Sequence, residues 1–249
     1  MIKNYKLKIA YDGSRYYGWE HQPDKDTIQG KLENVLAKMV DKEPEDIDII
    51  GAGRTDAGVH ARAMTASVKL DTDMTANGIR DYMNRYLPDD IAVAEVREAS
   101  DRFHARYNAQ GKTYQYTLFD GPVHPVFNRK YYQVLDRPID VELMQKAAEY
   151  MVGEQDFKSF CGNSHFKKST VRRIESLTVR RSKGYIYVTV SGTGFLQNMV
   201  RIIVGTLIEV GYERMKPEDI PVILEKKDRR LAGPTAPAKG LCLLNVRYK

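Results

Sequence analysis

One stretch early in the chain decides the fold, Gly51-Ala52-Gly53-Arg54-Thr55-Asp56-Ala57-Gly58-Val59-His60-Ala61. Residues 47–50 before it alternate between apolar and polar with a β-branched bias, which predicts a strand. Three glycines within eight residues then interrupt regular structure, because glycine adopts backbone conformations that other residues avoid. Residues 66–70 are predicted to return as a second short strand beside the first. The sequence therefore predicts two strands joined by a glycine-rich turn, with Asp56 at its crest.

The Asp56 carboxylate can serve such a turn in either of two ways. It can accept hydrogen bonds from its own backbone, as turn aspartates commonly do. It can instead be presented to a substrate, since no bulky side chain stands close to it in sequence. The turn by itself favours the first role, and support for the second comes from a segment far downstream.

That segment, residues 195–208, is apolar on every face of a helix, and such a helix is normally buried. Its only charge is Arg201, and a buried guanidinium must be paired because an unpaired one is costly. We expect a distant acid as its partner, with Asp56 as the candidate. The alternatives are that Arg201 extends to water or pairs with Glu209. An arginine partner would keep Asp56 ionised, as a nucleophile requires.

These residues carry a resemblance to a known family. The block Gly53-Arg54-Thr55-Asp56-Ala57-Gly58-Val59-His60-Ala61 resembles the catalytic motif of the TruA family of tRNA pseudouridine synthases. Further blocks follow in the family's order: Tyr11-Asp12-Gly13 with Gly18-Trp19, Phe103-His104-Ala105-Arg106, Lys112-Thr113-Tyr114-Gln115-Tyr116, residues 195–205 and Ala236-Pro237-Ala238-Lys239-Gly240-Leu241. They span nearly the whole chain and are specific together, although each is weak alone.

The resemblance implies an α+β fold of two similar subdomains, with mostly antiparallel sheets flanked by helices and joined around a basic active-site cleft. Strands that alternate with helices, without a Gly-rich dinucleotide loop, favour the same class. We place the N-terminal subdomain, with the Asp56 loop, at residues 1–107 and the C-terminal subdomain at residues 108–249. The resemblance also implies a homodimer in which one tRNA contacts both chains.

The periodicity of the remaining chain predicts its other elements. Helices are predicted at residues 26–39, where Asp26 and Gln29 form a capping-box pattern, and at 78–86, 141–152 and 217–224. Strands are predicted at residues 5–11, 91–96, 110–119, 174–180, 185–191 and 240–248. On the strand at 110–119, Tyr114 and Tyr116 share one face, which is ordinarily core packing. The resemblance implies instead that Tyr114 stacks on the reacting base and that Tyr116 packs behind it.

Composition bounds the function only broadly. The chain has 42% hydrophobic and 29% charged residues, no apolar run of membrane-spanning length and no signal-peptide core, so we expect a cytoplasmic protein without a membrane partner. Its two cysteines and its scattered histidines (His21, His60, His104, His124 and His165) show no metal-ligand spacing, which predicts reduced thiols and no metal. The formal net charge of +6 suggests a polyanionic partner without proving one.

Three basic, aromatic segments are candidates for RNA contact. The first is the loop after the opening strand, which offers Arg15, Tyr17, Trp19 and Gln22, although Trp19 can equally pin this loop to the core. The second contains Arg102, His104 and Arg106, and the third contains Lys167, Lys168, Arg172 and Arg173. For the second and third segments, plain solvated cations are the alternative. Glu20 stands where the family usually has glutamine, and a carboxylate there would repel phosphate.

The predicted function is the conversion of uridine to pseudouridine in tRNA without metal, nucleotide or redox cofactor. Asp56 is the predicted nucleophile, toward the ribose C1′ or the uracil C6, with Tyr114 and Arg201 beside it. Arg54 would engage a phosphate or help to extrude the base. The resemblance points to positions thirty-eight to forty of the anticodon stem-loop. Glu20 and the unusual residues 62–65 leave a paralogue with another RNA target as an alternative.

Two functions of other classes are also compatible with the sequence. A non-catalytic RNA-binding protein would use the same basic and aromatic loops. A glycoside hydrolase would need a second acid flanking the bond, and none stands out.

Overall fold

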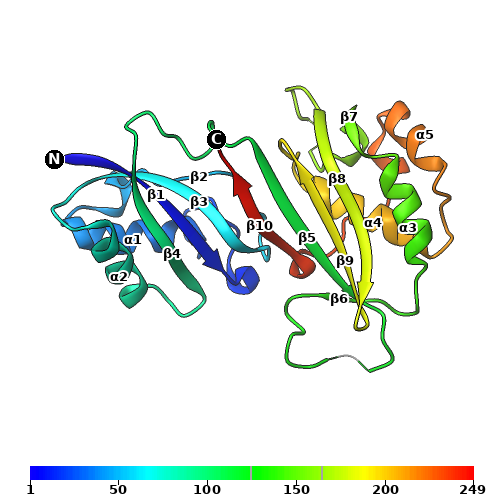
Figure 1. The fold of residues 1–249 in the computed structure, drawn as a ribbon, viewed down its shortest axis with the longest axis horizontal. Helices are drawn as coiled ribbons and strands as arrows, with labels where there is room; N and C mark the ends of the chain where they lie inside the picture. The colour runs from blue at the N-terminus through cyan, green and yellow to red at the C-terminus, as the bar shows by residue number, and fades with distance from the viewer. Residues whose placement is uncertain (124, 164) are drawn as a thin grey trace. The chain divides into compact units, whose positions relative to one another are not determined.

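Two units divide the chain in the computed structural model, which describes residues 1–123, 125–163 and 165–249 (Figure 1). Unit 1 contains Met1–Gln110 together with Cys242–Lys249, and unit 2 contains Gly111–Leu241. The end of the chain thus belongs with its beginning. The division at residue 107 predicted from the sequence places residues 242–249 in the second subdomain instead. Nothing in the local sequence pattern of these residues indicates that they pair with the first unit.

The sheet of unit 1 has the strand order β4-β1-β3-β10, with β2 paired to β3. The strands are β1 (Ile2–Tyr11), β2 (Ile50–Gly51), β3 (His60–Asp71), β4 (Ile91–Ala99) and β10 (Leu241–Arg247). β1 runs antiparallel to β3 and β4, with Leu7 opposite Ala66 and Val96, whereas β10 runs parallel to β3. Helices α1 (Ile28–Val40) and α2 (Ala76–Tyr86) flank this sheet (Figure 1). Alternate β1 residues, Leu7 and Ile9 among them, are fully buried.

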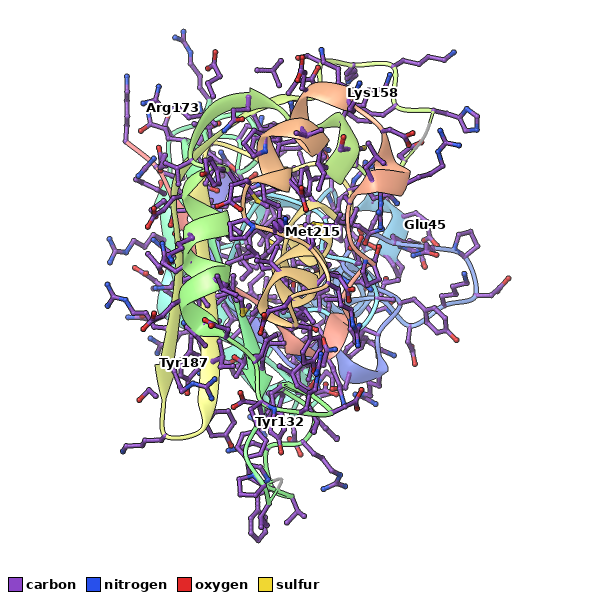
Figure 2. All side chains as sticks on the ribbon, turned by 90° about the vertical axis from the view of Figure 1, so that its right-hand side faces the viewer. Glu45, Tyr132, Lys158, Arg173, Tyr187 and Met215 are labelled. Carbon is purple, nitrogen blue, oxygen red and sulfur yellow. The ribbon has the colours of Figure 1, made fainter. Side chains whose placement is uncertain are left out.

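Unit 2 has the strand order β5-β9-β8-β7, with neighbouring strands antiparallel and β6 added parallel to β5. These strands are β5 (Gly111–Phe119), β6 (Gln133–Val134), β7 (Gly153–Asp156), β8 (Val171–Ser182) and β9 (Tyr185–Gly192). The helices are α3 (Val141–Glu149), α4 (Met199–Gly211) and α5 (Asp219–Lys226). α3 packs against both β8 and α4 (Figure 2). α4 is buried along nearly its whole length, which confirms the prediction from its all-round apolar surface.

The architecture is α+β, as predicted, with mostly antiparallel strands and flanking helices in each unit. Two local predictions were wrong in detail. The cap of α1 is Thr27, whose hydroxyl accepts the Gly30 N–H at 3.2 Å, whereas Asp26 forms an ion pair with Lys31. The strand predicted at residues 47–50 is paired only at Ile50–Gly51, because a 3-10 turn at Pro44–Asp46 delays its approach to β3.

None of the helices in the described part of the chain combines the length and the apolarity needed to cross a bilayer.

Candidate active site

The Asp56 turn, residues 51–60, connects β2 to β3 in unit 1. Its backbone is closed by a hydrogen bond from Val59 N–H to the Asp56 carbonyl oxygen at 3.1 Å. Gly58 has φ +78°, in the left-handed region that favours glycine. Asp56 itself lies within this turn and is half-buried.

Two earlier segments brace this turn from the side of Thr55. The Trp19 N–H donates to the Thr55 carbonyl oxygen at 3.0 Å, and the Tyr11 hydroxyl is 2.8 Å from Thr55 Oγ1. Gly18 lies so close that a Cβ there would be 2.6 Å from the same carbonyl oxygen. The residue before Asp56 is therefore held by its backbone and its side chain at once. This explains physically why the Tyr11-Asp12-Gly13 and Gly18-Trp19 blocks accompany the Asp56 block.

Gly13 makes a second close approach, on the other side of Asp56. A Cβ on Gly13 would lie 2.0 Å from the Val59 carbonyl oxygen, and the Gly13 N–H donates to His60 Nδ1 at 3.0 Å. Because its Nδ1 accepts this bond, His60 helps to position the turn. The His60 side chain is buried, with 5% exposed. The turn is thus fixed at both ends.

Trp19 is 2% exposed, and its ring covers Gly51, where a Cβ would lie 2.5 Å from the ring. Because the Trp19 ring is packed over Gly51 and almost wholly covered, it offers no face to an unpaired base. The structure therefore supports the alternative in which Trp19 pins the loop to the core, and it does not support the predicted stacking role.

Glu20 and Arg54 form an ion pair, with Oε1 2.6 Å from Nη2. Both side chains are about half exposed. The acid that departs from the family pattern therefore faces the cation beside Asp56, and the two charges neutralise each other. A phosphate approaching Arg54 would have to displace Glu20.

The other predicted contacts of the first loop differ in their availability. The Arg15 guanidinium is paired with Asp90, so the charge of Arg15 is already compensated. The Tyr16 hydroxyl also donates to the Asp90 carboxylate, at 2.6 Å. Tyr17 is 55% exposed, with Lys25 Nζ 5.1 Å from its ring centre. Gln22 donates from Nε2 to the Tyr17 carbonyl oxygen at 3.1 Å and so shapes the loop. Tyr17 and Lys25 together form an exposed pair of ring and cation.

His104 organises the second predicted segment. Its Nδ1 accepts the N–H groups of Arg106 and Tyr107, both at 3.2 Å, and its ring stacks on Tyr107 at a centroid distance of 4.1 Å. Arg102 and Arg106 are exposed, and Tyr107 is 79% exposed. The histidine therefore holds a turn that displays Arg106 and Tyr107 to solvent.

In unit 2, Tyr114 and Tyr116 lie on the buried face of β5, whereas Thr113 and Gln115 lie on the other face, as predicted. The Tyr114 ring meets Phe195 edge to face, at 5.4 Å and 88°. Tyr116 is fully buried with its hydroxyl 2.7 Å from the Pro237 carbonyl oxygen. Burial raises the pKa of Tyr116 well above its ordinary value, so it stays neutral and serves packing.

Arg201 lies in the first turn of α4 and is half-buried. Its Nε donates to the Ala236 carbonyl oxygen at 2.7 Å and Nη1 donates to Asn198 Oδ1 at 2.9 Å. Ala236 N–H returns a bond to the Arg201 carbonyl oxygen at 3.1 Å. Glu209, the proposed local partner, instead pairs with Arg214 at 3.2 Å, so that alternative was wrong. The sequence did not single out Asn198 or Ala236, although both lie within blocks of the resemblance.

The third predicted segment precedes and enters β8. Lys167, Lys168 and Arg173 are exposed, and Figure 2 shows Arg173 at the surface of unit 2. Arg172 is half-buried and donates from Nη1 to the carbonyl oxygens of Ser169 and Val171 at 2.9 and 2.6 Å. Arg172 therefore stiffens the segment, whereas the other three cations are accessible to a polyanion.

Within the described residues, no three or more His, Cys, Asp or Glu side chains gather as a metal site would require. His124 lies outside the described residues.

The whole chain is similar to known proteins. A family model described as tRNA pseudouridine synthase matches residues 8–108 and 147–249. A tRNA pseudouridine synthase A of Bacillus sp. (strain KSM-64) is 47% identical over 248 residues, which cover 99% of this chain and 100% of the relative. A tRNA pseudouridine synthase A of Caldicellulosiruptor bescii is 41% identical over 247 residues, with the same two coverages. Among solved structures, a chain of a Cbf5-Nop10-Gar1 complex aligns with a TM-score of 0.38 at 12% identity, covering 96% of this chain and 58% of that chain.

Proposed function

The chain belongs to the TruA family of tRNA pseudouridine synthases, and from this premise we propose which residues carry its reaction and which uridines it modifies. The enzyme is an isomerase that converts uridine to pseudouridine in tRNA. The base leaves the ribose by cleavage of its glycosidic C1′–N1 bond, turns over and rejoins through a C1′–C5 bond. C5 then loses its proton and N1 gains one, so atoms balance and a label at C5 is released. The hydrolytic and non-catalytic alternatives fall with this membership.

Asp56 is the proposed nucleophile. The observation that carries this assignment is the double brace on Thr55, which fixes the preceding residue and presents a half-buried carboxylate on a rigid turn. Preorganisation of this kind is what a reacting group requires. Attack at the ribose C1′ and attack at the uracil C6 are both compatible with a carboxylate in this setting.

Tyr114 and Arg201 are the proposed companions of Asp56. The edge-to-face contact with Phe195 fixes the Tyr114 ring, which suits it to stack on a base that has left its helix. Arg201 is held at Nε and Nη1 by Ala236 and Asn198, so its guanidinium is set in one orientation. We assign Arg201 to holding the reacting carboxylate ionised. Arg54, Tyr17, Arg106 and the exposed cations near β8 are assigned to the RNA backbone and to unpaired bases.

The proposed substrates are uridines at positions thirty-eight to forty of tRNA, and the proposed working form is a cytoplasmic homodimer. Full-length similarity to proteins named tRNA pseudouridine synthase A supports tRNA as the substrate, and the three positions are what the resemblance of the sequence blocks implies. Mapping pseudouridine in RNA from cells that lack this gene tests it. Loss of pseudouridine elsewhere, with these three positions intact, would favour the alternative of a paralogue with another target.

Replacing Asp56 with asparagine tests the catalytic assignment. Because the amide cannot act as the nucleophile, tritium release from tRNA labelled at uridine C5 should fall by at least about a thousandfold. tRNA binding should stay within about threefold of wild type, since one uncharged replacement leaves the basic surfaces intact. Asp48→Asn, at an exposed acid just before β2, is the matched control and should keep full activity. Wild-type tritium release by folded Asp56→Asn protein would refute the assignment.

A further inference from the structure

The face of the unit 1 sheet that carries Lys6 and Lys8 is basic. On β1 these two lysines alternate with the fully buried Leu7 and Ile9, so they project to the side opposite the apolar core. A pocket of about 200 Å³ lies on this face, lined by Lys6, Lys8, Thr65, Arg97, Asn245 and others. Three cations line this pocket, Lys6, Lys8 and Arg97, together with one acid, Glu95.

Two of these cations face each other directly. In the antiparallel register of β1 and β4, Lys6 is opposite Arg97 and Lys8 is opposite Glu95. Like charges in directly opposite positions destabilise a sheet. The Lys6–Arg97 pair therefore costs stability, and the fold alone does not need a cation at both positions. Burial, and then the charge of Arg97, lowers the pKa of Lys6, which is the signature of a cation without a compensating anion.

Of these three cations, the two lysines keep an uncompensated charge. Among the described residues, neither Lys6 nor Lys8 forms an ion pair, and Glu95 is paired with Arg97. Lys6 Nζ instead lies 4.1 Å from the ring centre of Tyr248 and 5.2 Å from that of Phe103, which fix its position without cancelling its charge. Two lysines and the amide of Asn245 therefore line one pocket together with Arg97, whose ion pair with Glu95 leaves the lining with an excess of positive charge.

We propose that this pocket binds a phosphate of the tRNA backbone, at a nucleotide other than the one that reacts. Donors of both charged and neutral kinds around a small open pocket are the usual contacts of a nucleic-acid phosphate. Lys8 pairs with Thr65 on β3, five residues from His60 at the end of the Asp56 turn, or about 17 Å at the usual strand rise. The contact therefore anchors the RNA at a distance from the reaction. This inference rests on the proposed function, since it takes tRNA as the ligand.

The test uses Lys8→Gln, alone and combined with Arg97→Gln, in the full chain. tRNA binding is measured over a series of salt concentrations. Removal of each phosphate-binding cation should weaken binding about threefold and reduce the slope of log K against log salt by about one. Lys8→Arg should restore both values because it keeps the charge. Lys38→Gln, which removes an exposed lysine of α1, is the matched control and should change neither.

The remaining measurements separate the outcomes. The kcat for tritium release at saturating tRNA should stay at the wild-type value while KM rises, because this phosphate is remote from the reacting base. An unchanged salt slope in the folded double variant overturns the proposal. So does a Lys8-dependent affinity for inorganic phosphate that is accompanied by unchanged tRNA binding, since the pocket would then hold a small anion. Failure of wild-type protein to release tritium would instead refute the proposed function. The salt slopes of tRNA binding would still show whether the pocket binds a phosphate of the RNA.

Discussion

At the scale of single residues, the Glu20–Arg54 pair sets the charge beside the reacting carboxylate. Arg54 is adjacent to Thr55, whose carbonyl oxygen accepts the Trp19 N–H, so the pair is held by the same brace that holds Asp56. An exposed ion pair of this kind contributes only about 0.2 to 1 kcal/mol. It is therefore weak enough for a phosphate to displace and strong enough to reduce affinity for RNA.

We predict that Glu20→Gln strengthens tRNA binding by about twofold to fivefold, because Arg54 no longer has to leave an acid. The slope of log K against log salt should increase by up to about one, because the carboxylate of Glu20 no longer offsets the phosphate contact of Arg54. Binding titrations at several salt concentrations measure both. Asp26→Asn removes an acid from another exposed pair of unit 1, with Lys31, and serves as the control that should leave the slope unchanged. Weaker binding by Glu20→Gln would contradict the idea.

At the scale of elements, the active turn depends on close backbone approaches by the loop that follows β1. Gly18 has φ +101°, and a Cβ there would meet the Thr55 carbonyl oxygen at 2.6 Å. Both features require glycine, one for conformation and one for space. The position of Asp56 is therefore determined by a residue far from it in sequence.

Gly18→Ala is predicted to displace the Asp56 turn. The strained φ and the clash should lower the free energy of unfolding by about 1 to 3 kcal/mol. A shift of the carboxylate by a fraction of an ångström should reduce kcat at least tenfold, with a much smaller effect on tRNA affinity. Chemical denaturation and single-turnover tritium release measure the two effects.

Gly78→Ala, within α2, is the comparison for this variant. A Cβ there lies 3.3 Å from the Thr75 hydroxyl, and φ is not in the left-handed region, so stability and kcat should be nearly unchanged. Wild-type kcat in Gly18→Ala would show that the brace is not needed for catalysis.

At the scale of the whole molecule, the last strand completes the unit that the first strand begins. β10 pairs in parallel with β3 at Cys242 and Leu243, directly after the Asp56 turn. The Gln110 N–H donates to the Arg247 carbonyl oxygen at 2.8 Å, and the Tyr248 hydroxyl donates to the Ala105 carbonyl oxygen at 2.6 Å. The end of the chain thus supports both the active turn and the segment of Phe103 and His104.

Leu243→Ala is predicted to lower the free energy of unfolding by about 2 to 5 kcal/mol, since Leu243 is 1% exposed and opposite Ala61. Leu244→Ala, at its half-buried neighbour, should cost clearly less. Urea denaturation of the full chain measures both. Equal destabilisation of the two variants would mean that the burial of Leu243 contributes no more to the free energy of unfolding than the half-buried Leu244 does.

The sequence by itself determined what depends on local period and on recognisable blocks. The alternation of residues 5–11 and the all-round apolar surface of α4 follow from side-chain spacing along one element, and both predictions were confirmed. The ordered blocks around Asp56 pointed to the family, which the comparisons then showed.

Only the tertiary structure decided which distant groups meet. The burial of Trp19 over Gly51, the pairing of Glu20 with Arg54 and the opposition of Lys6 and Arg97 depend on loop contacts and strand register. The return of β10 to unit 1 also depends on contacts between segments that are distant in the sequence. The physical reason is that a strand's own pattern fixes which face is buried but not which residue of another strand lies opposite it.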